Sequence, residues 1–91
     1  MNKKESAYTA ARTDLLREML RVGAFDMESG TRTEFVAATV RDLRHQHPDL
    51  DETLARKLTA EGMTFTYGDA NLAVAAAKGR GTPPEERPEA R

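Results

Sequence analysis

The residues of this chain best suited to binding a metal ion lie between His45 and Glu52. Two histidines and three carboxylates fall in this stretch: His45, His47, Asp49, Asp51 and Glu52. Histidines two residues apart point to different sides of a helix, so they could share one metal only if the helix frayed before Pro48. A simpler interpretation is that the histidines favour the C-terminal dipole of one helix and the carboxylates favour the N-terminal dipole of the next. We therefore expect no metal ion and no other cofactor.

A second acidic stretch, from Asp26 to Glu34, superficially resembles a calcium-binding loop, with carboxylates at Asp26, Glu28 and Glu34. Thr31 occupies the sixth position, where such a loop needs glycine, and Ala37 occupies the twelfth, where it needs glutamate, so calcium binding is not expected. The two serines, Ser6 and Ser29, lie in no nucleophile-elbow motif, and the sequence has no phosphate-loop, dinucleotide or zinc-protease motif. We predict that the protein is not an enzyme.

Size and composition indicate one small domain, whose core is either small, supplied efficiently by helices rich in alanine and leucine, or completed by a second copy or a partner. The 91 residues are 38% hydrophobic and 32% charged, with no cysteine and a net charge of −1. The two N-terminal lysines are not followed by an apolar run, and no stretch approaches the roughly 20 apolar residues of a membrane span, so a cytoplasmic protein without a membrane partner is expected. The balanced charge gives no compositional argument for nucleic-acid binding.

Hydrophobic periodicity predicts an all-α fold, a small compact bundle of three to four helices. The expected helices run from about Ser6 to Val22, Arg32 to His45 or His47, Leu50 to Glu61 and Asp69 to Lys78. Residues 1–79 would form the helical domain, and the proline-rich, charged residues 80–91 a disordered tail. The apolar positions at helical spacing predict this core: Leu15, Leu16, Met19, Val36, Val40, Leu43, Leu54, Leu58, Leu72 and Val74.

Local signals place the ends of these helices. Gly23 and Gly62 are expected to end the first and third helices. Capping-box spacing, in which a residue at the helix start is followed three positions later by an acidic residue, occurs at Thr31 and Glu34, at Asp49 and Glu52, and at Thr66 and Asp69.

The segments between and after these helices leave more than one interpretation open. Phe25 and Met27 are expected to plug the core under a loop. Residues Met63–Tyr67 alternate apolar and polar side chains, which suits an extended connector or a strand that pairs with a second copy. The fourth helix is apolar nearly all round and is expected to be buried. A homodimer would cover both segments, so the sequence leaves the oligomeric state open between monomer and homodimer.

The leading functional hypothesis is a small protein-interaction module that regulates or inhibits a macromolecular partner. An anti-defence protein of a phage or plasmid, such as an anti-CRISPR, is one example suggested by small size and absence of motifs. The partner-binding surface is expected at the end of the second helix and on the connector: Arg41, Arg44, Asp51, Glu52, Phe65 and Tyr67. Arginine and tyrosine are enriched among residues that dominate binding energy. The competing interpretation is that the two aromatic residues cover the core.

The alternative is a dimeric, helix-turn-helix-like DNA-binding regulator. Leu54–Leu58 has the pattern of a first helix in such a unit, but the helix that follows offers only Asn71 and Lys78 among alanines, and the connection before it is long. A different pair could serve if the second helix presents Arg41 and Arg44 to the phosphates. Nucleic acid is therefore the less favoured partner.

Overall fold

The structure is a computed structural model that describes residues 2–81 and the side chains of residues 2–76. It consists of α1 (Lys3–Val22), a single 3₁₀ turn η1 (Ala24–Asp26), α2 (Ser29–Gln46), α3 (Glu52–Gly62) and α4 (Tyr67–Gly81). The prediction of a small all-α bundle is confirmed. The predicted tail, residues 80–91, lies outside the described part of the chain apart from its first two residues, which belong to α4.

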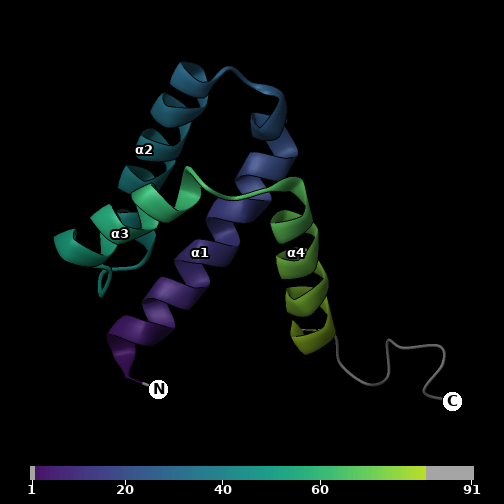
Figure 1. Ribbon diagram of the computed structural model, residues 1–91. Helices are drawn as coiled ribbons and strands as arrows, with labels where there is room; N and C mark the ends of the chain where they lie inside the picture. The colour runs from purple at the N-terminus through teal and green to yellow at the C-terminus, as the bar shows by residue number, and fades with distance from the viewer. Residues whose placement is uncertain (1, 82–91) are drawn as a thin grey trace, which may run out of the picture.

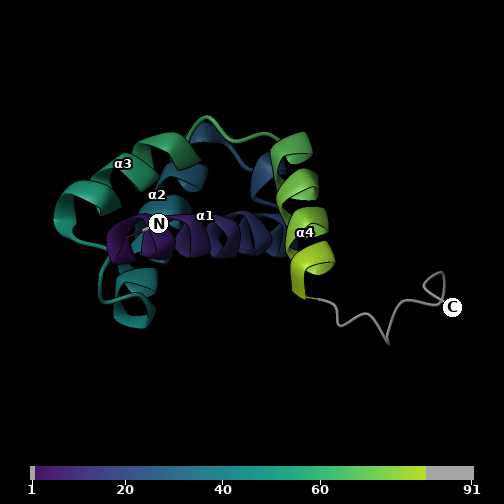
Figure 2. The same cartoon turned by 90° about the horizontal axis from the view of Figure 1, so that it is seen from below.

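Helix α1 forms the centre of the molecule. Figures 1 and 2 show α2 and α3 on one side of α1 and α4 on the other. The interhelical contacts agree, because α1 packs against each of the other three helices and α4 packs chiefly against α1. The molecule is thus built around one helix whose apolar residues serve two packing surfaces.

The core follows the predicted apolar stripes of the first three helices. Leu15, Leu16 and Met19 of α1 are fully buried, as is Leu58 of α3. The remaining predicted core residues of α2 are also buried: Val36, Val40 and Leu43. Leu54 and Val74 are only half-buried. The buried residues of α1, α2 and α3 belong to one core cluster, which holds the three helices together.

Three predicted helix ends are confirmed. Gly23 has φ 73°, a left-handed conformation that glycine adopts without steric cost, and its N–H donates to Leu20 O at the end of α1. Gly62 is the last residue of α3. Thr66 and Asp69 form the predicted capping box: Thr66 Oγ1 accepts from the Asp69 N–H at 3.2 Å, and Asp69 Oδ2 accepts from the Thr66 N–H at 2.9 Å.

The predicted capping box at Thr31 and Glu34 is wrong. Both residues lie inside α2, which begins at Ser29, three residues before the expected start at Arg32. The earlier start is stabilised by Arg32, whose Nε donates to Ala24 O at 3.1 Å and whose Nη2 donates to Met27 O at 3.1 Å. One guanidinium group therefore satisfies carbonyl groups of the preceding turn, and α2 begins without a side-chain cap.

The predicted start of α3 at Asp49 and Glu52 is also wrong. Asp51 is the N-cap, and its Oδ1 accepts a hydrogen bond from the Leu54 N–H at 2.9 Å. The shift arises because Pro48 and Asp49 form a turn, closed by the Leu50 N–H donating to His47 O at 2.9 Å. Leu50 is buried in front of the helix and is not part of it.

The expectation that α4 is buried all round is wrong. Ala70 is buried and Ala73 half-buried against the core, but Leu72 is 73% exposed. The cause is that α4 packs chiefly against α1, which covers one face only. Within residues 2–81, Met63–Tyr67 forms no strand: a turn at Met63 and Thr64 and two residues without regular secondary structure lead directly into α4, so this segment is a connector.

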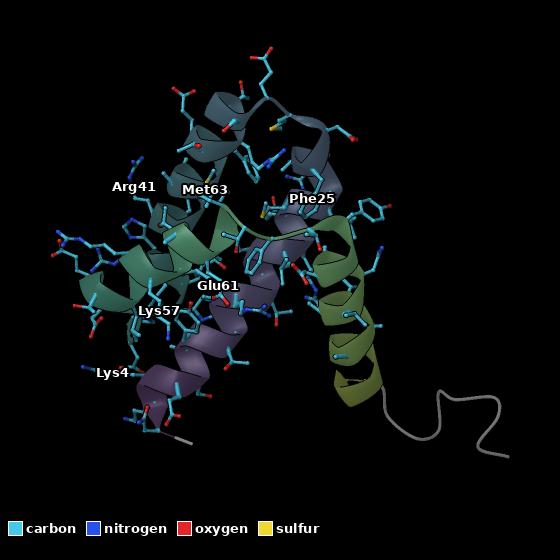
Figure 3. The ribbon with its side chains drawn as sticks, in the orientation of Figure 1. Lys4, Phe25, Arg41, Lys57, Glu61 and Met63 are labelled. Atoms are coloured by element: carbon cyan, nitrogen blue, oxygen red, sulfur yellow. The ribbon has the colours of Figure 1, made fainter. Side chains whose placement is uncertain are left out.

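Two helices distant in sequence, α1 and α3, are joined by a polar cluster over the core. The Tyr8 hydroxyl donates to the Glu61 carboxylate, and Arg12 Nε donates to the other Glu61 oxygen at 3.2 Å. The Arg12 guanidinium lies 4.8 Å from the ring centroid of Phe65, and Lys57 Nζ lies 5.1 Å from that of Tyr8. Figure 3 shows Lys57 and Glu61 on the side of α3 that faces α1. Burial and the hydrogen bond to Glu61 raise the pKa of Tyr8 well above its usual value.

Candidate binding groove

A shallow groove of about 410 Å³ runs between α2 and α3 on the side of the molecule away from α4. Its α2 wall consists of Ala37, Val40, Arg41 and Arg44. Its α3 wall consists of Glu52, Ala55, Arg56, Thr59 and Ala60. Both walls show the spacing of a single helix face, with lining positions three or four residues apart. We call this feature the α2–α3 groove.

Small and apolar side chains form the floor of the groove. Val40 and Ala55 are almost completely buried at its base. Ala37 is half-buried and Ala60 is exposed, and neither has a side chain longer than a methyl group. Such a floor offers apolar surface to a ligand and lets a ligand backbone approach the two helices closely.

The rim of the groove is basic. Arg41, Arg44 and Arg56 are exposed there, and Glu52 is the single acidic residue of the lining. Arg56 forms an exposed ion pair with Glu52 four residues before it. Figure 3 shows that Arg41 projects from the outer side of α2, away from α1. The groove therefore combines an apolar floor with an excess of positive charge.

Arg44 also has a structural role. Its Nε donates to Leu50 O at 3.3 Å, across the turn that joins α2 to α3. This hydrogen bond ties Arg44 to the turn that joins α2 to α3, while the Nη groups of its exposed side chain carry further N–H donors.

The structure brings together three of the six residues predicted to bind a partner, Arg41, Arg44 and Glu52. Asp51 lies just before the groove, where it caps α3 and pairs with Lys4 Nζ at 3.1 Å. Its pKa is lowered, first by the hydrogen bond from the Leu54 N–H and then by Lys4. Asp51 is thus engaged in holding the start of α3.

The two aromatic residues of the predicted surface lie elsewhere. Phe65 is 5% exposed and belongs to the core, with Arg12 over its ring, so the core interpretation is confirmed for this residue. Tyr67 is 60% exposed at the start of α4, where its ring meets Phe25 edge-on with centroids 5.9 Å apart. Figure 3 shows Phe25 on the opposite side of the molecule from Arg41, so Tyr67 and the groove do not form one surface.

Arg56 and the alanines of the groove are lining residues that were not predicted. Nothing in the local pattern distinguishes Arg56 from an ordinary solvated residue, and the alanines carry no chemistry of their own. The signal is present in the sequence: Ala37, Val40, Arg41 and Arg44 repeat the positions of one helix face, as do Glu52, Ala55, Arg56 and Thr59. The sequence pattern does not indicate that the face on α2 and the face on α3 line the same groove.

A second groove, between α1 and α2, has the opposite charge. Its lining includes Asp14, Glu18 and Asp42, against one arginine, Arg17. Helix α2 thus separates an acidic groove from a basic one. A charged ligand would distinguish the two grooves by sign alone.

The histidine-rich stretch forms a helix contact in this structure. His47 Nε2 lies 3.0 Å from Asp14 Oδ2 and joins the end of α2 to α1, whereas His45 is exposed. Among residues 2–81, no three His, Cys, Asp or Glu side chains are grouped so that they could hold a metal ion. None of the helices in this part of the chain is both long and apolar enough to cross a membrane.

Comparison with models of protein families, with curated proteins and with solved structures gives no match to this chain.

Proposed function

We propose that this protein is a small, non-enzymatic interaction module of the cytoplasm that regulates or inhibits a protein partner bound in the α2–α3 groove. The observation that supports the proposal is the groove itself, in which an apolar floor lies between three exposed arginines. Arginine is enriched among the residues that dominate binding energy, and an apolar centre inside a polar rim is the usual arrangement of a protein interface. An anti-defence protein of a phage or plasmid, such as an anti-CRISPR, is one proposed setting for this activity.

The test is affinity capture from nuclease-treated lysate of the cells that encode the protein, with mass spectrometry of the bound fraction. The groove variant is Arg41→Glu with Arg56→Glu, because Arg44 holds the turn before α3 and is left unchanged. The matched control is Arg17→Glu with Arg21→Glu on α1. Each pair combines an exposed arginine with one that forms an ion pair on its own helix, Arg56 with Glu52 and Arg21 with Glu18.

A partner that binds the wild type and the control but not the groove variant supports the proposal. A partner that binds all three proteins equally contradicts the assignment of the groove. Circular dichroism of each variant checks that the helices are retained.

DNA binding is the second candidate, and the observation that favours it is the same row of three arginines, which could contact phosphates. Retention on heparin or on duplex DNA that falls steeply with salt would support this alternative. A protein inhibitor with a net charge of −1 should pass through such a column.

Self-association is a separate proposal and concerns α4. The two large hydrophobic side chains that are exposed in the described part of the chain, Tyr67 and Leu72, both lie on this helix. A homodimer that pairs two α4 helices would cover Leu72. Light scattering at micromolar concentration tests this proposal. A dimer that Leu72→Glu dissociates would support it, and a 10.1 kDa monomer in the wild type would contradict it.

A further inference from the structure

The shape of the α2–α3 groove restricts the kind of segment that can occupy it. The α3 wall extends from Glu52 to Ala60, which is about 12 Å of helix, or slightly more than two turns. Its floor is made of two packed helices and offers no row of free backbone N–H and C=O groups to an extended chain. An added strand needs such a row, whereas an amphipathic helix needs only an apolar trough between two helices.

The size of the floor side chains favours close approach of a helix. Val40 and Ala55 form the base, and Ala37 and Ala60 stand on either side of it. Three of these four side chains are the methyl groups of alanine, and Val40 is the single larger one, so the apolar stripe of a third helix could pack into the trough between α2 and α3.

Charge selects the polar part of this ligand. The groove carries three arginines and one glutamate, and Glu52 is already paired with Arg56. Among the side chains of residues 2–76, none forms an ion pair with the Arg41 guanidinium. Carboxylates on either side of an apolar stripe would meet these guanidinium groups, while a lysine-rich helix would be repelled. The acidic groove on the other side of α2 would repel the same ligand.

From these observations we infer that the α2–α3 groove binds an acidic amphipathic α-helix of a partner protein, with an apolar stripe on the floor and carboxylates on the arginine rim. The inference rests on the proposed function, since it names the ligand of that site. Three features carry it: the two-turn length, the floor of three alanines and one valine, and the excess of positive charge.

The test uses two synthetic helical peptides of about 18 residues, long enough to form helix in solution. Both carry the same alanine and leucine stripe; one has glutamate beside the stripe and the other has lysine. Fluorescence anisotropy at low salt measures their binding to the intact protein. We expect the glutamate peptide to bind at least about tenfold more tightly than the lysine peptide, with an affinity that falls as salt is added.

Two groove variants locate the binding. Arg41→Glu with Arg56→Glu should weaken the glutamate peptide by about tenfold or more, and Arg17→Glu with Arg21→Glu should leave it unchanged. Ala60→Trp fills the groove from an exposed position and should also block binding. Ala38→Trp, at an exposed position lining the acidic groove, is its control.

Equal binding of the two peptides, or binding that neither groove variant weakens, would overturn the inference. A DNA duplex that binds in a manner sensitive to Arg41 and Arg56, while the glutamate peptide does not bind, would overturn it in favour of phosphate recognition. The outcome for the proposed function is separate. A lysate protein whose capture depends on Arg41 and Arg56, together with failure of the glutamate peptide, would retain the interaction module and reject the acidic helix as its ligand.

Discussion

Gly62, the last residue of α3, lies against Val36 of α2 so closely that no larger residue fits between the two helices without movement. A Cβ atom at Gly62 would lie 2.8 Å from Val36 Cγ1 and 3.0 Å from Leu15 Cδ2. Both neighbours are fully buried, and the β-branched Val36 has little rotamer freedom in a helix. The absence of a side chain at Gly62 therefore sets how closely α1, α2 and α3 approach at this end of the core.

Gly62→Ala should destabilise the protein by about 1–3 kcal/mol, the usual cost of adding a methyl group to a filled core. The prediction is specific because alanine is intrinsically about 1 kcal/mol better than glycine inside a helix, so helix propensity alone gives the opposite sign. Urea unfolding followed by circular dichroism measures the change. Val36→Ala should cost less when combined with Gly62→Ala than it does alone, since it removes the clash.

Gly30→Ala is the control for that experiment. Gly30 lies in the first turn of α2, and a Cβ atom there would have no neighbour within 4 Å. The substitution should be neutral or stabilise the protein by up to about 1 kcal/mol. A destabilisation equal to that of Gly62→Ala would show that the contact with Val36 is not the cause.

Two leucines that were both predicted to lie in the core should respond very differently to truncation. Leu58 is fully buried between the helices, so Leu58→Ala should cost about 2–5 kcal/mol. Leu72 is 73% exposed, so Leu72→Ala should change the stability of the monomer by less than about 0.5 kcal/mol. Equal losses in urea unfolding at low protein concentration would mean that α4 packs differently from the arrangement described above.

The contrast between Leu58 and Leu72 shows which parts of the fold the sequence could predict. Apolar spacing identifies the buried face of α2, where Val36, Val40 and Leu43 all point inward, because polar residues mark its other side. Helix α4 carries alanines on every side, so its periodicity contains no information about which face is covered. That choice is made by α1, which reaches one side of α4 only.

The starts of α2 and α3, and the groove between them, escape prediction for a related reason. Local spacing predicts a cap at Thr31, but the actual start of α2 depends on Arg32 reaching carbonyls of the preceding turn, a contact that exists only after the chain has folded. Similarly, composition predicts Arg41 and Glu52 as site residues one by one. Arg56 is missed because its place beside them follows from how α3 lies against α2.

The position of the α3 cap gives a further prediction. Asp51→Ala should lower the melting temperature, because it removes both the acceptor for the Leu54 N–H and the partner of Lys4. Asp49→Ala should leave the melting temperature nearly unchanged, since Asp49 lies in the turn before the cap. Thermal unfolding at neutral pH compares the two variants. A larger drop in melting temperature for Asp49→Ala than for Asp51→Ala would indicate that Asp49 caps α3, as the sequence predicted.

Acid should reduce the contribution of the Asp51 carboxylate to the stability of the fold. The folded-state pKa of Asp51 is lowered by the Leu54 N–H and by Lys4, so its contribution to stability is present above the unfolded-state pKa, about 3.9 for aspartate. The contribution is lost as the pH falls through the lower, folded-state pKa. The difference in melting temperature between the wild type and Asp51→Ala should therefore shrink below about pH 4, and a constant difference down to the acid limit would contradict this account.

The hydrogen bond from the Tyr8 hydroxyl to Glu61 should make the stability of the fold sensitive to alkali. Burial and the hydrogen bond to Glu61 raise the pKa of Tyr8, so folding favours the neutral phenol. Its contribution is fully present below the unfolded-state pKa of tyrosine, about 10, and is lost as the pH rises above that value.

Tyr67→Phe leaves Tyr8 as the single tyrosine of the chain, so phenolate absorbance then reports on Tyr8 alone. We expect this phenolate to form at higher pH in the folded protein than in urea, and the stability of Tyr67→Phe to fall more steeply above about pH 10 than that of Tyr8→Phe with Tyr67→Phe. The two proteins differ only in the Tyr8 hydroxyl, so the difference between their curves reports on that group. Parallel curves would show that the Tyr8 hydroxyl does not bind Glu61 in solution.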